Sequence, residues 1–273
     1  MAYYSAELAN YISKYQMSKA YIPPPPPTPS PLAGVKKIIL VGSGKGGVGK
    51  SFVAVNLAVA LAKAGCKTGL VDADIHGPSV AKMLGISGEP LVEKNQIIPP
   101  EKYGIKVMSM GFLIGEEAPL VWRGPMISKA LYQLLRAAKW GELDFLVIDM
   151  PPGTGDIHLS IAQNFTVDGA VIVTTPQEVA ILDVKKCINM LKKVGVPILG
   201  IVENMSYFPD AVGNKNYIFG APKGEQLSAS VGTKFLAEIP LDPKISELSD
   251  KGIPAGGAIF DEMAGKVRDL IKR

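Results

Sequence analysis

The stretch from Lys36 to Ser51, with the sequence KKIILVGSGKGGVGKS, limits the fold of this chain most strongly. It begins with a short apolar run, residues 36–41, that ends in glycines and is typical of a buried strand. The next residues match the phosphate-binding pattern G-x-x-x-x-G-K-S/T: Gly44, Lys45, Gly46, Gly47, Val48, Gly49, Lys50 and Ser51. The sequence therefore predicts a strand, a phosphate-binding loop and a helix that starts near Lys50.

Each residue type in this loop has a physical reason to be there. Glycines let the backbone turn tightly around an anion and point successive N–H groups at it. The helix that begins with Lys50, Ser51 and Phe52 adds the positive end of its dipole. Lys50 would place a positive charge on the terminal phosphates, and Ser51 would offer its hydroxyl to Mg²⁺.

A dinucleotide site is the alternative interpretation of the same glycines. Gly42, Gly44 and Gly47 also satisfy G-x-G-x-x-G, and Asp72 and Asp74 follow the next predicted strand, where a ribose would bind. This pattern alone would indicate a nicotinamide or flavin cofactor. The Gly-Lys-Ser ending favours phosphate together with a metal ion.

A second apolar strand, FLVID at residues 145–149, supports the phosphate and metal interpretation. It ends in Asp149, and a carboxylate at the carboxyl end of a parallel strand lies near the Mg²⁺ of a phosphate-binding loop. Many strands end in Asp, so this feature is informative only together with the loop. The turn that follows, residues 150–156, is well placed to sense the terminal phosphate.

The rest of the core alternates strands and helices, which predicts an α/β fold with a doubly wound, mostly parallel sheet covered on both faces. Further strands are expected at residues 68–71, 105–110, 171–174, 197–203 and 235–239. Helices are expected at residues 79–84, 128–140, 179–194 and near the C-terminus. The apolar stripe of the last helix, with Phe260, Met263 and Val267, indicates core packing rather than membrane attachment.

The first 34 residues have a different sequence pattern from the rest of the chain. Residues 5–20 predict an amphipathic helix, and residues 23–27 are five consecutive prolines, which form an extended spacer. We therefore divide the chain into an N-terminal arm, residues 1–34, and a core domain, residues 35–273. The arm either docks on the core, a dimer mate or another partner, or is a loosely ordered tail.

Composition excludes several classes of protein. The net charge of +4 is too small to indicate nucleic-acid binding. No run approaches ~18 apolar residues, and the N-terminus lacks an apolar signal core, so we expect a cytoplasmic protein without a membrane span. Cys66 and Cys187 are the only cysteines and cannot build a disulfide framework.

Lys45 gives the loop the form K-G-G-V-G-K-S, which resembles the deviant Walker A motif of the MinD/ParA/nitrogenase-iron-protein ATPases. The resemblance implies an ATP-dependent homodimer in which Lys45 reaches the nucleotide of the partner subunit. The alternative is a solvated lysine without this role.

Four further motifs are similar to those of one branch, the Mrp (ApbC-like) family of iron–sulfur cluster carrier ATPases. They are DADIHGPS at residues 72–79, IDMPPGTGD at 148–156, VENMSYF at 202–208 and IPLDP at 239–243. The match runs from about Val35 to the C-terminus. It implies a P-loop NTPase fold, hydrolysis of Mg-ATP, and iron–sulfur apo-proteins or scaffold proteins as partners.

The resemblance also implies roles for single residues. Lys45, Lys50 and Asp74 would be catalytic, with Asp74 positioning the attacking water. Ser51, Asp74 and Asp149 would surround Mg²⁺. Asn204 would hydrogen-bond the adenine, and the base would be bordered by Pro240 and Asp242.

One departure from the family concerns the cargo. In the family, N-M-S-Y-F is closely followed by a C-P-x-C pair, and two such pairs hold a cluster between the subunits. Here the continuation is PDAVGN, residues 209–214, without a cysteine. Cluster binding needs soft thiolates, for which Asp210 is a poor substitute. Cys66 and Cys187 are best explained as buried small hydrophobes.

Three functions therefore remain open at this point. The first is iron–sulfur protein maturation with cluster ligands supplied by a partner. The second is a nucleotide-switched adaptor that holds no cluster, which the missing cysteine pair favours over a plain reading of the first. The third is a MinD/ParA-like positioning ATPase that acts on a membrane or on DNA. The lack of a basic or strongly amphipathic tail weighs against this third function.

Overall fold

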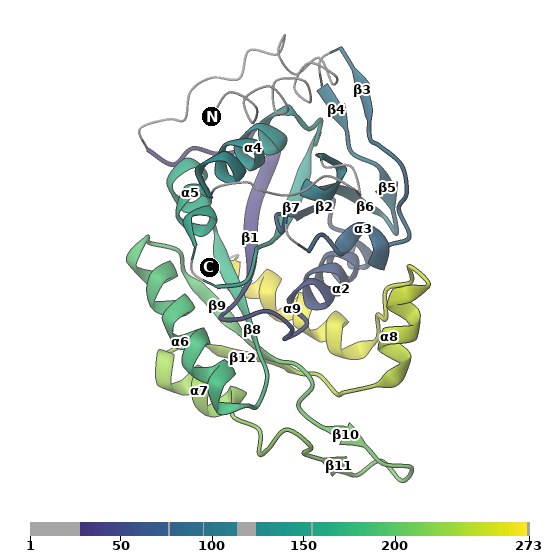
Figure 1. Ribbon diagram of the computed structural model, residues 1–273, viewed down its shortest axis with the longest axis vertical. Helices are drawn as coiled ribbons and strands as arrows, with labels where there is room; N and C mark the ends of the chain where they lie inside the picture. Colours follow the sequence, from purple (N-terminus) through teal and green to yellow (C-terminus); the bar gives the residue numbers. More distant parts are fainter. Residues whose placement is uncertain (1–27, 76, 95, 114–123, 154, 272–273) are drawn as a thin grey trace.

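The computed structural model describes residues 28–75, 77–94, 96–113, 124–153 and 155–271 (Figure 1). The predicted helix at residues 5–20 and the proline run at 23–27 lie outside these ranges. From residue 28 onward, the end of the arm contacts the core. Ser30 forms a bridge with Phe165, Leu32 is buried, and Arg136 donates a hydrogen bond to the Ser30 hydroxyl at 2.9 Å.

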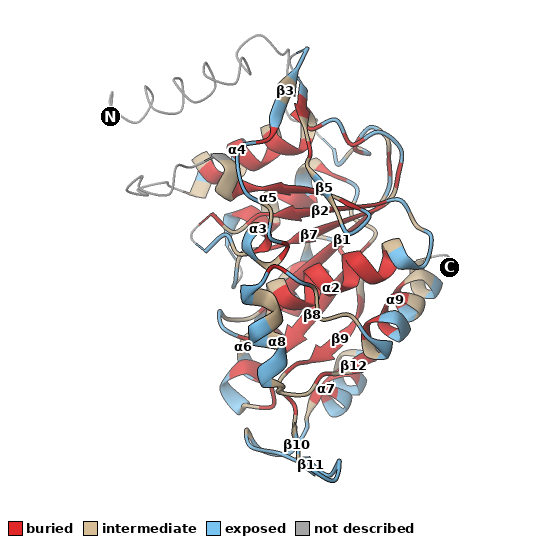
Figure 2. Cartoon of the chain, turned by 90° about the vertical axis from the view of Figure 1, so that its right-hand side faces the viewer, coloured by how far each residue is buried: buried red, intermediate tan, exposed pale blue. Residues whose placement is uncertain are grey.

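Buried strands form the middle of the molecule (Figure 2). The described residues build an eight-stranded sheet in the order β12–β9–β8–β1–β7–β2–β6–β5, and only the short edge strand β5 runs antiparallel to its neighbour. Its strands are β1 (Val35–Ser43), β2 (Thr68–Asp72), β5 (Glu101–Lys102), β6 (Ile105–Ser109), β7 (Leu143–Asp149), β8 (Gly169–Thr174), β9 (Ile198–Glu203) and β12 (Lys234–Glu238). The strands β1, β2, β7, β8 and β9 are buried almost throughout because helices cover both faces.

Two hydrophobic clusters, one on each face of the sheet, make up the core. One cluster contains α2 (Lys50–Lys63) and α9 (Ala258–Ile271), which contact each other through an edge-to-face pair of Phe52 and Phe260 with ring centroids 5.5 Å apart. The other contains α4 (Gly124–Ala137), α5 (Asp156–Asn164), α6 (Glu178–Lys193) and α7 (Gly224–Val231). The apolar stripe of the last helix therefore packs in the core.

The remaining elements are short. They are α3 (Val80–Met83), β3 (Leu91–Glu93), β4 (Gln96–Ile98), the 3₁₀ helix η2 (Met110–Leu113), β10 (Phe208–Pro209), β11 (Lys215–Asn216) and α8 (Pro243–Asp250). β3 pairs with β4, and β10 with β11, as two separate hairpins. The β10–β11 hairpin extends away from the sheet at one end of the molecule (Figure 1).

The predicted doubly wound, mostly parallel α/β fold is confirmed. The chain adds β7, β2 and β6 on one side of β1 and β8, β9 and β12 on the other, so the strand order reverses next to β1. In such sheets, ligands bind outside the carboxyl ends of the strands at this reversal. Among the described residues, no helix has the length and apolar character needed to cross a membrane.

Candidate functional site

The loop between β1 and α2 lies at the reversal of strand order. Gly47 and Gly49 have positive φ angles of 78° and 81°, a conformation that residues with a Cβ atom rarely adopt. Gly44 packs so closely on α6 that a Cβ atom would lie 2.3 Å from the backbone of Asp183. The glycines are therefore required by the turn itself and by its close contact with a neighbouring helix.

The loop encloses a cavity of about 240 Å³ together with residues that follow β2 and β7. The cavity is lined by Ser43, Lys45, Gly46, Gly47, Gly49, Lys50, Ser51, Phe52, Asp74, Gly77, Ser79, Met83 and Pro152. The structure thus brings Asp74 to the predicted phosphate-binding loop, although the two are more than 20 residues apart in the sequence.

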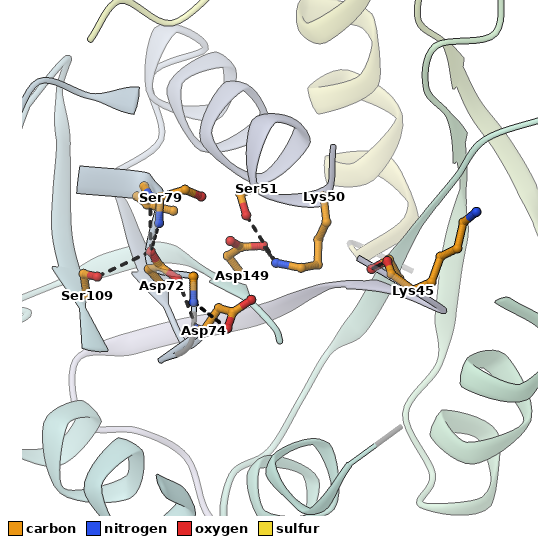
Figure 3. A network of polar contacts seen from close by, with 11 residues as sticks. Lys45, Lys50, Ser51, Asp72, Asp74, Ser79, Ser109 and Asp149 are labelled. Atoms are coloured by element: carbon orange, nitrogen blue, oxygen red, sulfur yellow. Dashed lines mark hydrogen bonds and ion pairs between the residues drawn. The ribbon is translucent and has the colours of Figure 1, made fainter. Parts of the chain in front are cut away.

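An ion pair at the base of the cavity joins the two predicted motifs. Lys50 Nζ lies 2.5 Å from Asp149 Oδ1 and 3.3 Å from the Ser51 hydroxyl (Figure 3). Both partners are buried, with Lys50 6% and Asp149 0% exposed. Burial raises the pKa of Asp149, and the positive charge of Lys50 opposes this rise.

The residues of the cavity fit a Mg²⁺-bound nucleotide. Asp149 Oδ2 is buried and has no hydrogen-bond partner within the described ranges, so it offers an acceptor for a metal-bound water. The Ser51 hydroxyl lies beside the same ion pair, and the loop at the start of α2 suits an anion. Mg²⁺ needs few protein ligands because phosphates and waters complete its coordination, and when bound it neutralises charge on the phosphates.

Asp74 is held near this centre by its neighbour in the D-A-D motif. Asp72 and Asp149 are paired residues of the adjacent strands β2 and β7. Burial and the nearby Asp149 charge raise the pKa of Asp72 to about 7. The Asp74 carboxylate in turn accepts a hydrogen bond from the Gly77 N–H at 3.3 Å.

Lys45 points away from Lys50 and Asp149 (Figure 3). Its Nζ lies 3.5 Å from Gln177 Oε1, just before α6. The side chain therefore runs across the outer side of the loop and not into the base of its own cavity.

The residues predicted to border the base have other contacts in the structure. Asn204 is 3% exposed and donates a hydrogen bond to the Val48 carbonyl at 2.9 Å, so it stabilises the loop between β1 and α2. Asp242 accepts a hydrogen bond from the Lys244 N–H at 2.9 Å and caps α8. Asn204, Pro240 and Asp242 do not line the cavity formed by the described residues. Their contact with adenine stays a prediction.

His158 is a buried residue that the sequence gave no reason to select. It lies on α5, 1% exposed, and neither ring nitrogen has a hydrogen-bond partner among the described residues. Burial and the charge of Lys50 lower its pKa to about 4. The imidazole is therefore neutral at physiological pH.

The hairpin where the resemblance would place a cysteine pair closes without one. Asp210 Oδ1 accepts hydrogen bonds from the N–H groups of Val212 and Asn214, and Oδ2 accepts one from the Asn214 side chain. These bonds with Asn214 lower the pKa of Asp210. Within the described ranges, no three His, Cys, Asp or Glu side chains are grouped as a metal site.

The two cysteines lie on opposite faces of the sheet. Cys187 is buried in the cluster that contains α6, where burial raises its pKa to about 11, and Cys66 packs against the cluster that contains α2. Cys187 is therefore a small core residue, as expected, whereas Cys66 is only half-buried. The two thiols cannot bind one cluster within a single chain.

Together, the reversal of strand order next to β1, the glycine loop and the Lys50–Asp149 pair define a P-loop NTPase. More specifically, the chain belongs to the ParA family described as NUBPL iron-transfer P-loop NTPases, whose profile matches residues 34–272. The predicted resemblance to iron–sulfur carrier ATPases of the MinD/ParA type is thereby confirmed.

Individual relatives agree with this assignment. An iron-sulfur cluster carrier protein of Aquifex aeolicus is 53% identical over 234 residues, which cover 84% of this chain and 64% of the relative. An Arabidopsis thaliana iron-sulfur protein required for mitochondrial NADH dehydrogenase is 52% identical over 249 residues, which cover 90% of this chain and 79% of the relative. This chain thus spans slightly less than two thirds of the Aquifex relative's length.

One similar solved structure contains a bound nucleotide. The nucleotide-binding protein of Archaeoglobus fulgidus in complex with ADP superposes with a TM-score of 0.72 at 42% sequence identity. The superposition covers 81% of this chain and 88% of that chain. The fold that surrounds the cavity is therefore shared with a protein that binds a nucleotide.

Replacing Lys50 tests the cavity as a nucleotide site. We expect Lys50→Ala to abolish ATP binding in calorimetry, because the phosphates lose their cation. The matched control is Lys63→Ala in the exposed last turn of the same helix, which should bind as the wild type does. Thermal unfolding is measured beside binding, because the substitution leaves Asp149 without its partner. Unchanged ATP affinity in folded Lys50→Ala protein would refute the site.

Replacing His158 tests its neutral, buried state. Its folded pKa of about 4 lies below the ordinary 6.5, so the unfolded chain binds more protons between these values. Its contribution to stability is complete above pH 6.5 and is lost as the pH falls toward 4. The difference in unfolding free energy between wild type and His158→Leu should change by about 3 kcal/mol across this window, to the disadvantage of the wild type at low pH. Parallel stability curves would contradict this assignment.

Proposed function

We propose that this chain is a dimeric Mg-ATP switch that acts in the transfer or assembly of iron–sulfur clusters. The observation that carries the proposal is the buried Lys50–Asp149 pair at the base of a glycine-loop cavity. A cation and a carboxylate at this place are the groups that the phosphates and Mg²⁺ of a nucleotide require. Membership of the iron-transfer family supplies the biological context.

Nucleotide binding rearranges the ion pair at the base of the cavity. In the structure, Lys50 neutralises the buried Asp149. Bound phosphates would draw the Lys50 ammonium toward themselves, and Asp149 and Ser51 would then hold Mg²⁺, which would supply positive charge to the phosphates. Asp74, which also lines the cavity, would accept a hydrogen bond from the water that attacks the terminal phosphate and orient it. ATP hydrolysis is the reaction that this arrangement supports.

The direction of Lys45 supports the proposed dimer. The side chain leaves its own cavity along the outer side of the loop and ends beside Gln177. A second copy facing the loop brings this cation to the partner's nucleotide. ATP then holds the two copies together, and hydrolysis releases them. Asn204, Pro240 and Asp242 remain our candidates for the adenine side of the site.

The cargo is an iron–sulfur cluster whose thiolates come from a client or scaffold protein. The chain's own cysteines lie on opposite faces of the sheet, and Asp210 uses its oxygens to close the hairpin turn. The second candidate is an adaptor that is switched by nucleotide and never holds a cluster. The closed Asp210 turn is the observation that favours it.

Replacing Lys45 tests the dimer. We expect Lys45→Ala to bind ATP as the wild type does and to lose both ATP-dependent dimerisation, measured by sedimentation velocity, and hydrolysis. Lys185→Ala, an exposed lysine on α6, is the control and should keep both. Normal hydrolysis by Lys45→Ala would show that the cation has no role across the dimer.

Anaerobic reconstitution with iron and sulfide separates the two candidates for the cargo. We expect no stable cluster on the isolated wild type by absorption and Mössbauer spectroscopy, and cluster binding only when a cysteine-bearing apo-protein client is present. The Cys66→Ser/Cys187→Ser variant should behave as the wild type does. A cluster on the isolated wild type that this variant loses would contradict the partner-supplied ligands. No cluster on the wild type, whether alone or with the client protein, would favour the adaptor.

A further inference from the structure

Asp72, at the end of β2, is a buried carboxylate with four hydrogen bonds. Oδ1 accepts the N–H of Asp74 at 3.1 Å. Oδ2 accepts the N–H of Ser79 at 3.0 Å, the N–H of Val80 at 3.1 Å and the hydroxyl of Ser109 at 3.4 Å. The residue is 0% exposed, so water does not compete for these bonds (Figure 3).

These bonds hold both ends of one turn. Asp74 stands at the beginning of the turn that follows β2, and Ser79 and Val80 stand at its end, where α3 starts. A local helix cap acts over two or three residues, whereas Asp72 lies seven residues before Ser79. The carboxylate therefore joins the two ends of this segment, at Asp74 and at Ser79 and Val80. Asp74 and Ser79, at its two ends, both line the cavity.

We propose that Asp72 is a positioning residue for ATP hydrolysis: it fixes the turn after β2 so that the Asp74 carboxylate faces the phosphate-binding loop. The inference rests on the proposed function, because it concerns the reaction in which Asp74 takes part. Asp72 does not line the cavity and acts only through Asp74. A carboxylate is needed here because its two oxygens accept all four donors, while an amide has a single acceptor oxygen.

The first test is Asp72→Asn, which keeps the size of the side chain and removes one acceptor. We expect its dissociation constant for ATP to stay within about two-fold of the wild type, because Lys50 and the loop do not depend on this turn. The single-turnover rate of hydrolysis should fall by about ten-fold or more. Asp168→Asn is the matched control, because Asp168 Oδ2 also accepts a backbone N–H, from Ile38 at 2.8 Å, far from the cavity. It should leave the rate unchanged.

A double-mutant cycle distinguishes positioning from a merely structural role. If Asp72 acts through Asp74, Asp72→Asn should cause no further loss of rate in an Asp74→Asn background. A further loss as large as in the wild-type background would overturn the proposal. The proposal would also be overturned if the dissociation constant for ATP rose by the same factor by which the rate falls. Should Asp72→Asn not fold, Asp72→Glu takes its place, because it keeps the charge and moves the oxygens by one methylene.

Hydrogen exchange keeps this inference testable apart from the proposed function. If the wild type does not hydrolyse ATP, the proposed activity fails while the turn can still be measured. We then expect Asp72→Asn to raise amide exchange in peptides covering residues 73–80 with ADP bound, and to leave peptides covering the loop at residues 44–51 unchanged. Unchanged exchange over residues 73–80 would overturn the positioning role of Asp72.

Discussion

The buried ion pair between Lys50 and Asp149 is the interaction on which the site depends. Removing two charges from water is costly, and their attraction repays this only with good geometry and further hydrogen bonds. Here the pair is short, and one oxygen of Asp149 has no partner among the described residues. An apolar pair of equal size would serve packing as well. The charges are therefore best understood as groups held ready for a phosphate and a metal ion.

The sheet brings these groups together because parallel strands end on the same edge. Asp149 is the last residue of β7, and Asp72, which pairs with it in register, is the last residue of β2. Strand β1 lies between β7 and β8 and leads into the glycine loop. The loop is supported on two sides, by α6 against Gly44 and by Asn204 below Val48. Asp72 ties the turn after β2 to the same edge. The cavity is thus built from segments that are distant in sequence but adjacent in the sheet.

Much of this arrangement could be predicted from the sequence, because the controlling patterns are local. The glycine loop, the strand ending in Asp149 and the alternation of strands and helices each occupy a short window. The short helices α5, α7 and α8 and the two hairpins were not predicted, because they are short and carry few apolar repeats and many polar residues. The roles of Asp72, Asn204 and His158 depend on burial and on how the chain folds around each side chain, and no local sequence pattern reports these surroundings. The closed turn at Asp210 could be suspected only from the missing cysteines.

Calorimetric titration of the wild type with ATP, with and without Mg²⁺, tests the site most directly. We predict one ATP per chain and an affinity that is much weaker without Mg²⁺, because Asp149 would stay buried and uncompensated once Lys50 turns to the phosphates. No binding, or the same affinity in the absence of Mg²⁺, would contradict the assignment of Lys50, Ser51 and Asp149 to a Mg-nucleotide site.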